Sequence, residues 1–291
     1  MASSTLLGRG LSERFLIDLT RGDLEPLLES VKARRLDLQI RGGYLNVYDG
    51  RASLLKLEET PAGYRATIHH KYEPGDLASD GSGDYRTRTI PADEAARWAN
   101  DFAQTLPRLQ EQAAEFDKDE GRDEFEIAMA NRAPPIVVID RQTRLSGHRR
   151  SQMDLYAAAI EGDVVTLLLV ELKRQAAANP TDVYAAVKQI ADYAELHAPG
   201  GHLREDIATS LETIAEQRAR LGLIEPLPAD TRLASVPIRA VVAIELPAAE
   251  RFTPPDVVAQ PQEVWFARVD QETHRFQPTS AWYRCAPAAG R

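Results

Sequence analysis

The chain has almost no cysteine and no long apolar run, and both absences narrow its class. Its 291 residues include a single cysteine, Cys285, so an internal disulfide is excluded and a reducing compartment is expected. No apolar stretch approaches the roughly 20 residues that a membrane-spanning helix needs, and the start of the sequence lacks the basic and apolar segments of a signal peptide. These features predict a cytoplasmic protein that does not associate with membranes.

The sequence also lacks nucleotide-binding signatures and a basic overall charge. Neither a P-loop nor a GxGxxG pattern is present, which gives no support to nucleotide-driven motor activity. Its 44 acidic residues outnumber 35 Lys and Arg, giving a formal net charge of -9. A chain of this charge does not coat nucleic acid through bulk attraction, although a local basic groove remains compatible with it. What is present is a hydrophobic share of 43%, typical of a globular protein with a buried core.

Residues 1–116 predict a β-rich α+β N-terminal domain. Apolar and polar residues alternate over 36–72, and small turn pairs such as Asp49-Gly50 interrupt the pattern, which predicts three or four antiparallel strands. Apolar residues at helical spacing predict one helix over 11–34 and another, after the strands, with a break at Pro107. The role of this domain is open between sensing, binding of a partner protein and binding of DNA.

Residues 117–291 predict an α/β domain with a mixed central sheet flanked by helices. The highly charged segment 116–124 marks the boundary near residue 117. Short, fully apolar segments are typical of buried strands in such a sheet. Strands are expected at 135–140 and 238–246, and helices over 120–131, 181–197 and 203–221.

The most informative segments, 152–160 and 164–174, predict a β-hairpin whose turn contains Gly162. In a tight hairpin centred there, Asp154 and Glu171 become cross-strand neighbours, with Cβ atoms roughly 4.5–5.5 Å apart. Lys173 follows Glu171 by two residues and therefore projects from the same face. The sequence thus predicts two carboxylates and an ammonium together at one end of an otherwise apolar hairpin.

This grouping of charges indicates a metal site. Two close carboxylates repel each other and raise one pKa unless a cation compensates. Carboxylate oxygens are hard ligands that suit Mg²⁺ or Mn²⁺. Lys173 could then hold or help deprotonate a metal-bound water, or balance charge on a phosphoryl group. The alternative is a solvated sheet face carrying a surface ion pair, worth about 0–1 kcal/mol.

The same residues carry a family resemblance. The order of these residues resembles the PD-(D/E)xK phosphodiesterase superfamily, in its RecB-like branch with a Gln-xxx-Tyr motif. The matching residues are Asp154, then Glu171-Leu172-Lys173, then Gln189 and Tyr193, which lie one turn apart on the next helix. The resemblance covers about residues 119–196, with a continuation to about 246, and Met153 stands where the family often has proline.

The resemblance implies a restriction-endonuclease-like core and assigns a role to each matching residue. Asp154, Glu171 and the Leu172 carbonyl would bind Mg²⁺ or Mn²⁺, and Lys173 would position the attacking water. In the family, the glutamine and tyrosine, here Gln189 and Tyr193, support the site or contact nucleic acid. An acidic residue on the preceding helix often completes the site, and the candidates here are Glu124 and, as the alternative, Glu126.

A basic segment directly precedes the hairpin. Residues 141–150 carry four arginines and one histidine but no acid, and arginine is suited to bidentate contact with phosphate. The expected clamp on a nucleic-acid backbone consists of Arg144, Arg149, Arg150 and Arg174. The alternative is an ordinary solvated loop.

These observations predict a magnesium-dependent nuclease, an enzyme that hydrolyses phosphodiester bonds in DNA. RNA remains open as a substrate, because recognition of the 2′-hydroxyl depends on local geometry. Analogy with the family suggests a bacterial antiviral-defence or restriction-type effector, acting as a homodimer that cuts both strands. The competing hypothesis is a catalytically inactive nuclease-fold protein that binds nucleic acid or a partner protein.

Overall fold

The computed structural model describes residues 9–69, 85–116, 121–144, 152–174, 180–197, 204–247 and 263–285. The chain divides into two compact units. The first unit comprises Gly8–Phe125 and Gln217–Leu223, and the second comprises Glu126–Glu216 and Ile224–Arg291 together with Met1–Leu7. The division falls at residue 125, and a short segment from late in the chain belongs to the first unit. None of the helices in the described ranges is long and apolar enough to cross a membrane.

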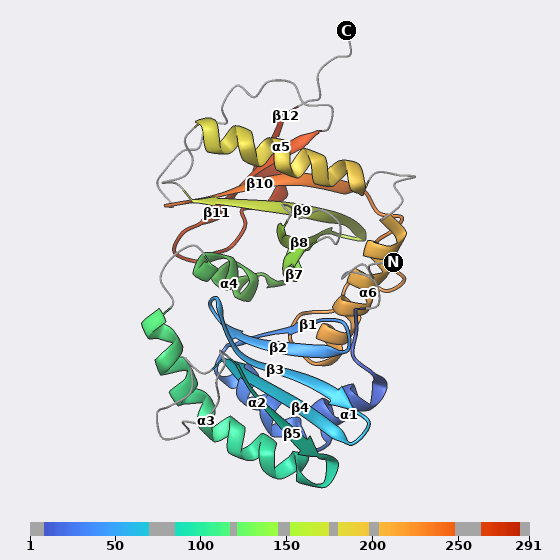
Figure 1. Ribbon diagram of the computed structural model, residues 1–291. Helices are drawn as coiled ribbons and strands as arrows, with labels where there is room; N and C mark the ends of the chain where they lie inside the picture. The colour runs from blue at the N-terminus through green and yellow to red at the C-terminus, as the bar shows by residue number, and fades with distance from the viewer. Residues whose placement is uncertain are drawn as a thin grey trace. The chain divides into compact units, whose positions relative to one another are not determined.

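The first unit is built on a five-stranded antiparallel sheet (Figure 1). Its strands follow one another in chain order, each paired with the next. Three or four antiparallel strands are expected between residues 36 and 72; the structure has four there, and a fifth follows. They are β1 (Asp37–Ile40), β2 (Tyr44–Asp49), β3 (Ala52–Thr60), β4 (Gly63–His69) and β5 (Tyr85–Pro91).

Two helix predictions for this unit are wrong. The single helix expected over 11–34 is two helices, α1 (Glu13–Arg21) and α2 (Glu25–Ala33). Gly22 follows α1 and Pro26 lies in the first turn of α2, the residue types that end and begin helices. After the short 3₁₀ helix η3 (Ala92–Glu94), α3 (Ala95–Phe116) continues through Pro107 without the expected break.

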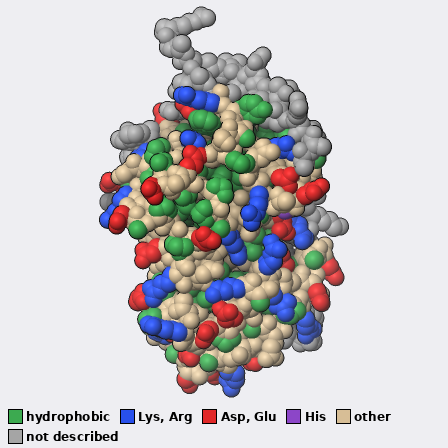
Figure 2. Space-filling view, turned by 180° about the vertical axis from the view of Figure 1, so that it is seen from behind, with side chains coloured by type: hydrophobic (Ala, Val, Ile, Leu, Met, Phe, Trp, Pro, Cys, Tyr) green, Lys and Arg blue, Asp and Glu red, His purple; other side chains and the backbone are tan. Residues whose placement is uncertain are grey.

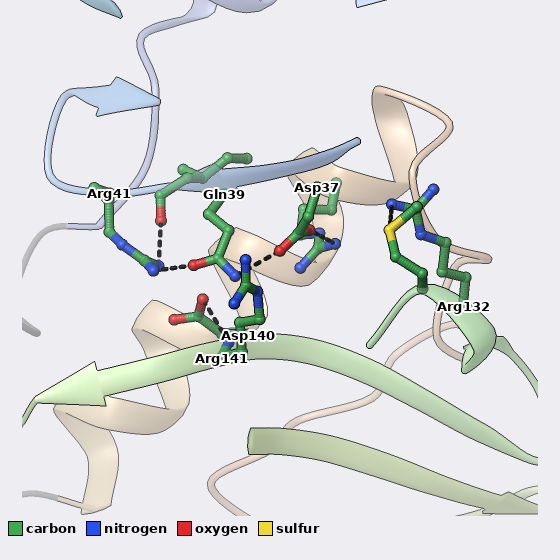
Figure 3. Close-up of polar contacts among 9 residues, drawn as sticks. Asp37, Gln39, Arg41, Arg132, Asp140 and Arg141 are labelled. Carbon is green, nitrogen blue, oxygen red and sulfur yellow. Dashed lines mark hydrogen bonds and ion pairs between the residues drawn. The ribbon is translucent and has the colours of Figure 1, made fainter. Parts of the chain in front are cut away.

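The two faces of this sheet differ in character. Alternate residues of every strand, such as Leu38, Leu45 and Leu57, join buried side chains of α1, α2 and α3 in one apolar core. On the other face, Asp37 and Gln39 project from β1, and Arg41, which directly follows the strand, contacts Gln39 (Figure 3). The sheet therefore has one face covered by its helices and one polar face.

On the polar face, the side chain of Asp37 of β1 forms an ion pair. Arg218 lies in the segment Gln217–Leu223 of the first unit, and its Nη2 is 3.1 Å from Oδ1 of Asp37. Gln39 Nε2 donates to Oδ2 of the same carboxylate at 2.7 Å. Asp37, Gln39 and Arg218 are all buried, and all three belong to the first unit.

The second unit contains a seven-stranded mixed sheet with the order β12-β11-β10-β9-β8-β7-β6. Strands β6 to β9 are antiparallel, β10 runs parallel to both β9 and β11, and β12 is antiparallel to β11. The strands are β6 (Arg132–Ala133), β7 (Ile136–Arg144), β8 (Gln152–Glu161), β9 (Val164–Arg174), β10 (Ile238–Leu246), β11 (Val264–Asp270) and β12 (Tyr283–Cys285).

Helices flank both faces of this sheet, as expected for an α/β unit. The helices in this part of the chain are α4 (Gly121–Ala130), α5 (Pro180–Leu196), α6 (Arg204–Arg220) and the 3₁₀ helix η5 (Thr279–Ala281), of which α4 begins and α6 ends in the first unit. Helix α5 packs on β9 and β10, and α4 lies on the opposite side of the sheet (Figure 1). Ile127 and Ala128 of α4 share a core with alternate residues of the strands, such as Val170 and Val241.

Charged side chains of both signs are spread over the surface. In the view of Figure 2, Lys and Arg side chains are interspersed with Asp and Glu side chains among the described residues. Although the net charge of the chain is -9, positively charged side chains are therefore also present on this face.

Candidate functional site

The β8–β9 hairpin has the predicted register. Leu155 pairs with Val170, so the next positions along the two strands are Asp154 and Glu171. The turn contains Gly162 with φ of 63°, a left-handed conformation that glycine adopts without steric cost. The turn therefore fixes the pairing that brings the two carboxylates to one end of the hairpin.

Glu171 lies at the centre of the site. Its Oε1 accepts a hydrogen bond from Lys173 Nζ at 2.9 Å, and its Oε2 accepts one from Gln189 Nε2 at 2.8 Å. Glu171 is only 3% exposed, whereas the Lys173 side chain is 24% exposed. Because Gln189 lies on α5, which packs on β9, one oxygen of this buried carboxylate is held by the neighbouring helix and the other by Lys173 of the same strand.

Asp154 is partly buried beside Glu171. The Leu172 N–H donates to its Oδ2 at 2.8 Å. Burial and the neighbouring Glu171 carboxylate raise the pKa of Asp154 to about 7, although the Leu172 N–H and the Lys173 ammonium both act to lower it. A single lysine thus does not compensate the two carboxylates, and Asp154 is partly protonated near neutral pH when no further cation is bound.

Tyr193 lies one helical turn after Gln189 and is buried. Its carbonyl accepts a 2.7 Å hydrogen bond from Nδ1 of His197, whose Nε2 is 3.2 Å from the Tyr156 hydroxyl. Burial is the main cause that lowers the pKa of His197, so a neutral imidazole can accept from Tyr156. Tyr156 follows Asp154 by two positions and so lies on the same face of β8, which places this cluster next to the site on the hairpin.

His197 and Tyr156 are site-supporting residues that sequence reasoning missed. The only available signal was spacing, because His197 follows Tyr193 by four residues and Tyr156 follows Asp154 by two. Such spacings show that side chains share a face, but they do not identify a contact between a strand and a helix.

Two carboxylates suit a divalent ion that retains several water ligands. The ranges that the structure describes contain no group of three or more His, Cys, Asp or Glu side chains able to hold a metal ion. Glu124 belongs to the first unit and Glu126 to the second, and a role for either in the site stays a prediction. The same holds for the Leu172 carbonyl as a ligand.

The predicted basic loop is partly a strand. Strand β7 continues to Arg144, which pairs with Gln152 of β8, so residues 141–144 are not loop. Arg141 is buried, and its backbone N–H donates to Oδ1 of Asp140 at 2.9 Å (Figure 3). This arginine therefore cannot belong to an exposed clamp. The clamp candidates Arg149 and Arg150 lie outside the described residues, as do the side chains of Arg144 and Arg174.

Comparison of the chain with protein-family models, with curated proteins and with solved structures finds no match. Its function is therefore inferred from its own residues: a buried glutamate, an aspartate with a raised pKa, a lysine and a glutamine meet where α5 packs on the β8–β9 hairpin.

Proposed function

We propose that the protein is a divalent-metal-dependent nuclease that hydrolyses phosphodiester bonds in DNA, with a restriction-endonuclease-like core in its second unit. The observation that carries the proposal is the meeting of Asp154, Glu171 and Lys173 on one end of a hairpin. The mixed sheet with α5 against β9 and β10 is compatible with this core.

Each residue has a separate task in the proposed site. Asp154 and Glu171 would hold Mg²⁺ or Mn²⁺, which would neutralise charge on the phosphoryl oxygens and lower the pKa of a bound water. Lys173, which is more exposed than Glu171, orients the attacking water or contacts a phosphate oxygen. Gln189 and the Leu172 N–H fix the orientation of the two carboxylates, as groups behind metal ligands do.

A purely structural ion pair explains these contacts less well. A surface pair would leave both partners exposed and contribute little, but Glu171 is buried. Two carboxylates beside one lysine retain excess negative charge, as the raised pKa of Asp154 indicates. Such an uncompensated buried group destabilises a fold, and perturbed carboxylates of this kind concentrate at functional sites.

The test is cleavage of supercoiled and linear DNA with Mg²⁺, Mn²⁺ or EDTA, with RNA and single-stranded DNA assayed in parallel. Lys173→Met and Glu171→Gln should each reduce metal-dependent cleavage by about 100-fold or more, the usual effect of removing a group that stabilises the transition state. Asp163→Asn is the matched control, because Asp163 is an exposed carboxylate in the turn of the same hairpin, and it should cut like the wild type.

Two outcomes would redirect the proposal. Equal cleavage by the wild type and Lys173→Met would refute the role of the lysine. DNA binding without cleavage under any metal condition would favour the catalytically inactive binding protein instead.

A further inference from the structure

The polar face of the five-stranded sheet is a second candidate site, in the first unit. Side chains that alternate with the apolar core residues project from this face. The register aligns Tyr44 with Glu58, Glu58 with Arg65, and Arg65 with Thr89, and it pairs His69 with Tyr85. We call this face over β2–β5 the open face, and its side chains include Tyr44, Asn46, Lys56, Glu58, Arg65, Thr67, His69, Tyr85, Thr87 and Thr89.

The open face is exposed where it crosses β3, β4 and β5. Tyr85 is 64% exposed, and the side chains of Arg65 and Lys56 are 48% and 40% exposed. At β1, by contrast, Asp37 is fully buried in its ion pair with Arg218. A large exposed aromatic residue among exposed cations is unusual for a surface that only faces water.

Cations outnumber acids on the open face. Arg65 lies 2.7 Å and Lys56 lies 3.5 Å from the same Glu58 oxygen, so one carboxylate serves two cations. This excess of positive charge occurs in a chain whose net charge is -9. The local charge is therefore complementary to a polyanion, the opposite of what the composition alone suggests.

Aromatic rings flank these cations. Lys56 Nζ lies 4.2 Å from the centre of the Tyr44 ring, and the rings of His69 and Tyr85 meet edge to face at 4.8 Å. Tyr44 and Tyr85 are three strands apart and offset by four residues along the strands, a diagonal of roughly 20 Å at ordinary strand spacing. Lys56, Arg65 and the threonine hydroxyls lie between the two aromatic groups.

We propose that the open face binds a single-stranded nucleic acid, with bases stacked on Tyr85 and Tyr44 and phosphates contacted by Lys56 and Arg65. Interleaved aromatic and cationic side chains on a sheet suit unpaired bases, which offer their ring faces, whereas a duplex keeps its bases stacked inside. The proposal does not require the second unit to cleave.

The test is fluorescence anisotropy of a labelled oligothymidylate with the full-length protein in EDTA, which keeps cleavage out of the measurement. Tyr85→Ala should weaken binding by about fivefold or more, the lower end for one stacked base. Arg65→Gln should weaken binding and reduce the slope of log K against log salt by about 0.7, the value for one phosphate contact on a single strand. Arg88→Gln is the matched control, because Arg88 lies on the other face of β5, is exposed and is paired with Glu94.

Wild-type affinity in both open-face variants would overturn the proposal, as would an equal loss in Arg88→Gln. A change of self-association or of a protein contact in the variants, without a change of oligonucleotide affinity, would assign the face to a protein partner and also overturn it. The nuclease assay tests the second unit independently of this binding assay. Binding through the open face without cleavage would contradict only the proposed nuclease. Cleavage without any contribution from the open face would contradict only the present proposal.

Discussion

Replacing Asp154 with asparagine should stabilise the metal-free protein while removing its capacity to hold a cation. The amide has the shape of the protonated carboxyl. Its oxygen can accept the hydrogen bond from the Leu172 N–H, and its nitrogen can donate towards Glu171, as a protonated carboxyl would. The substitution therefore removes the charge without removing the contacts.

The magnitude follows from the pKa of Asp154, which burial and the Glu171 carboxylate raise from 3.8 to about 7 in the folded protein. Between these values the folded state retains a proton that the unfolded state releases, so the free energy of unfolding falls by about 1.4 kcal/mol for each pH unit. The contribution is fully present below pH 4 and is lost as the pH rises through 7. The asparagine variant should therefore gain on the wild type by up to about 4 kcal/mol at pH 8.

The assay is urea unfolding in EDTA at pH 5 and pH 8. A Trp98→Phe background removes the one tryptophan of the first unit and leaves Trp265 and Trp282 of the second as fluorescent reporters. We expect Asp154→Asn to gain much more at pH 8 than at pH 5, and the Asp163→Asn control to show no such difference. An equal loss of stability in Asp154→Asn at both pH values would refute the reasoning.

Two further predictions concern the first unit. Arg218→Met should destabilise it by about 3–5 kcal/mol in urea unfolding, because the Asp37 carboxylate stays buried without the guanidinium, and adding Asp37→Asn should restore part of the loss. Gly63→Ala should cost more than Gly43→Ala, which should cost about 1–2 kcal/mol. Both glycines have positive φ. A Cβ at Gly63 would lie 2.2 Å from the Ile90 carbonyl oxygen, whereas a Cβ at Gly43 would have no heavy atom within 4 Å. Equal losses in the two alanine variants would contradict this.

The β8–β9 hairpin could be predicted from the sequence because its information is local. A two-residue periodicity and a glycine at the turn determine which positions face each other, and these two features alone predict Asp154 beside Glu171. The bond from Gln189 to Glu171 is less local. Helical spacing predicted that Gln189 and Tyr193 share a face of α5, but only the packing of α5 on β9 shows which face meets the carboxylate.

Other features depend on tertiary packing and could not be predicted. Helix α3 continues through Pro107 because Phe102, Leu106 and Leu109 are buried in the core on both sides of it, and this burial outweighs the roughly 3 kcal/mol that a proline costs in a helix. Arg141 looked like a surface arginine because its segment is basic, yet β7 extends past it into pairing with β8. Nothing in the local sequence predicts that Gln217–Leu223, far along the chain, belongs to the first unit.

The most direct test of the proposed metal site is titration of the metal-free protein with Mn²⁺ in a calorimeter at pH 8, where Asp154 is ionised. We predict saturable binding by the wild type and by Asp163→Asn, and loss of that binding in Asp154→Asn. Undiminished binding by Asp154→Asn, or no binding by the wild type, would contradict a site formed by Asp154 and Glu171.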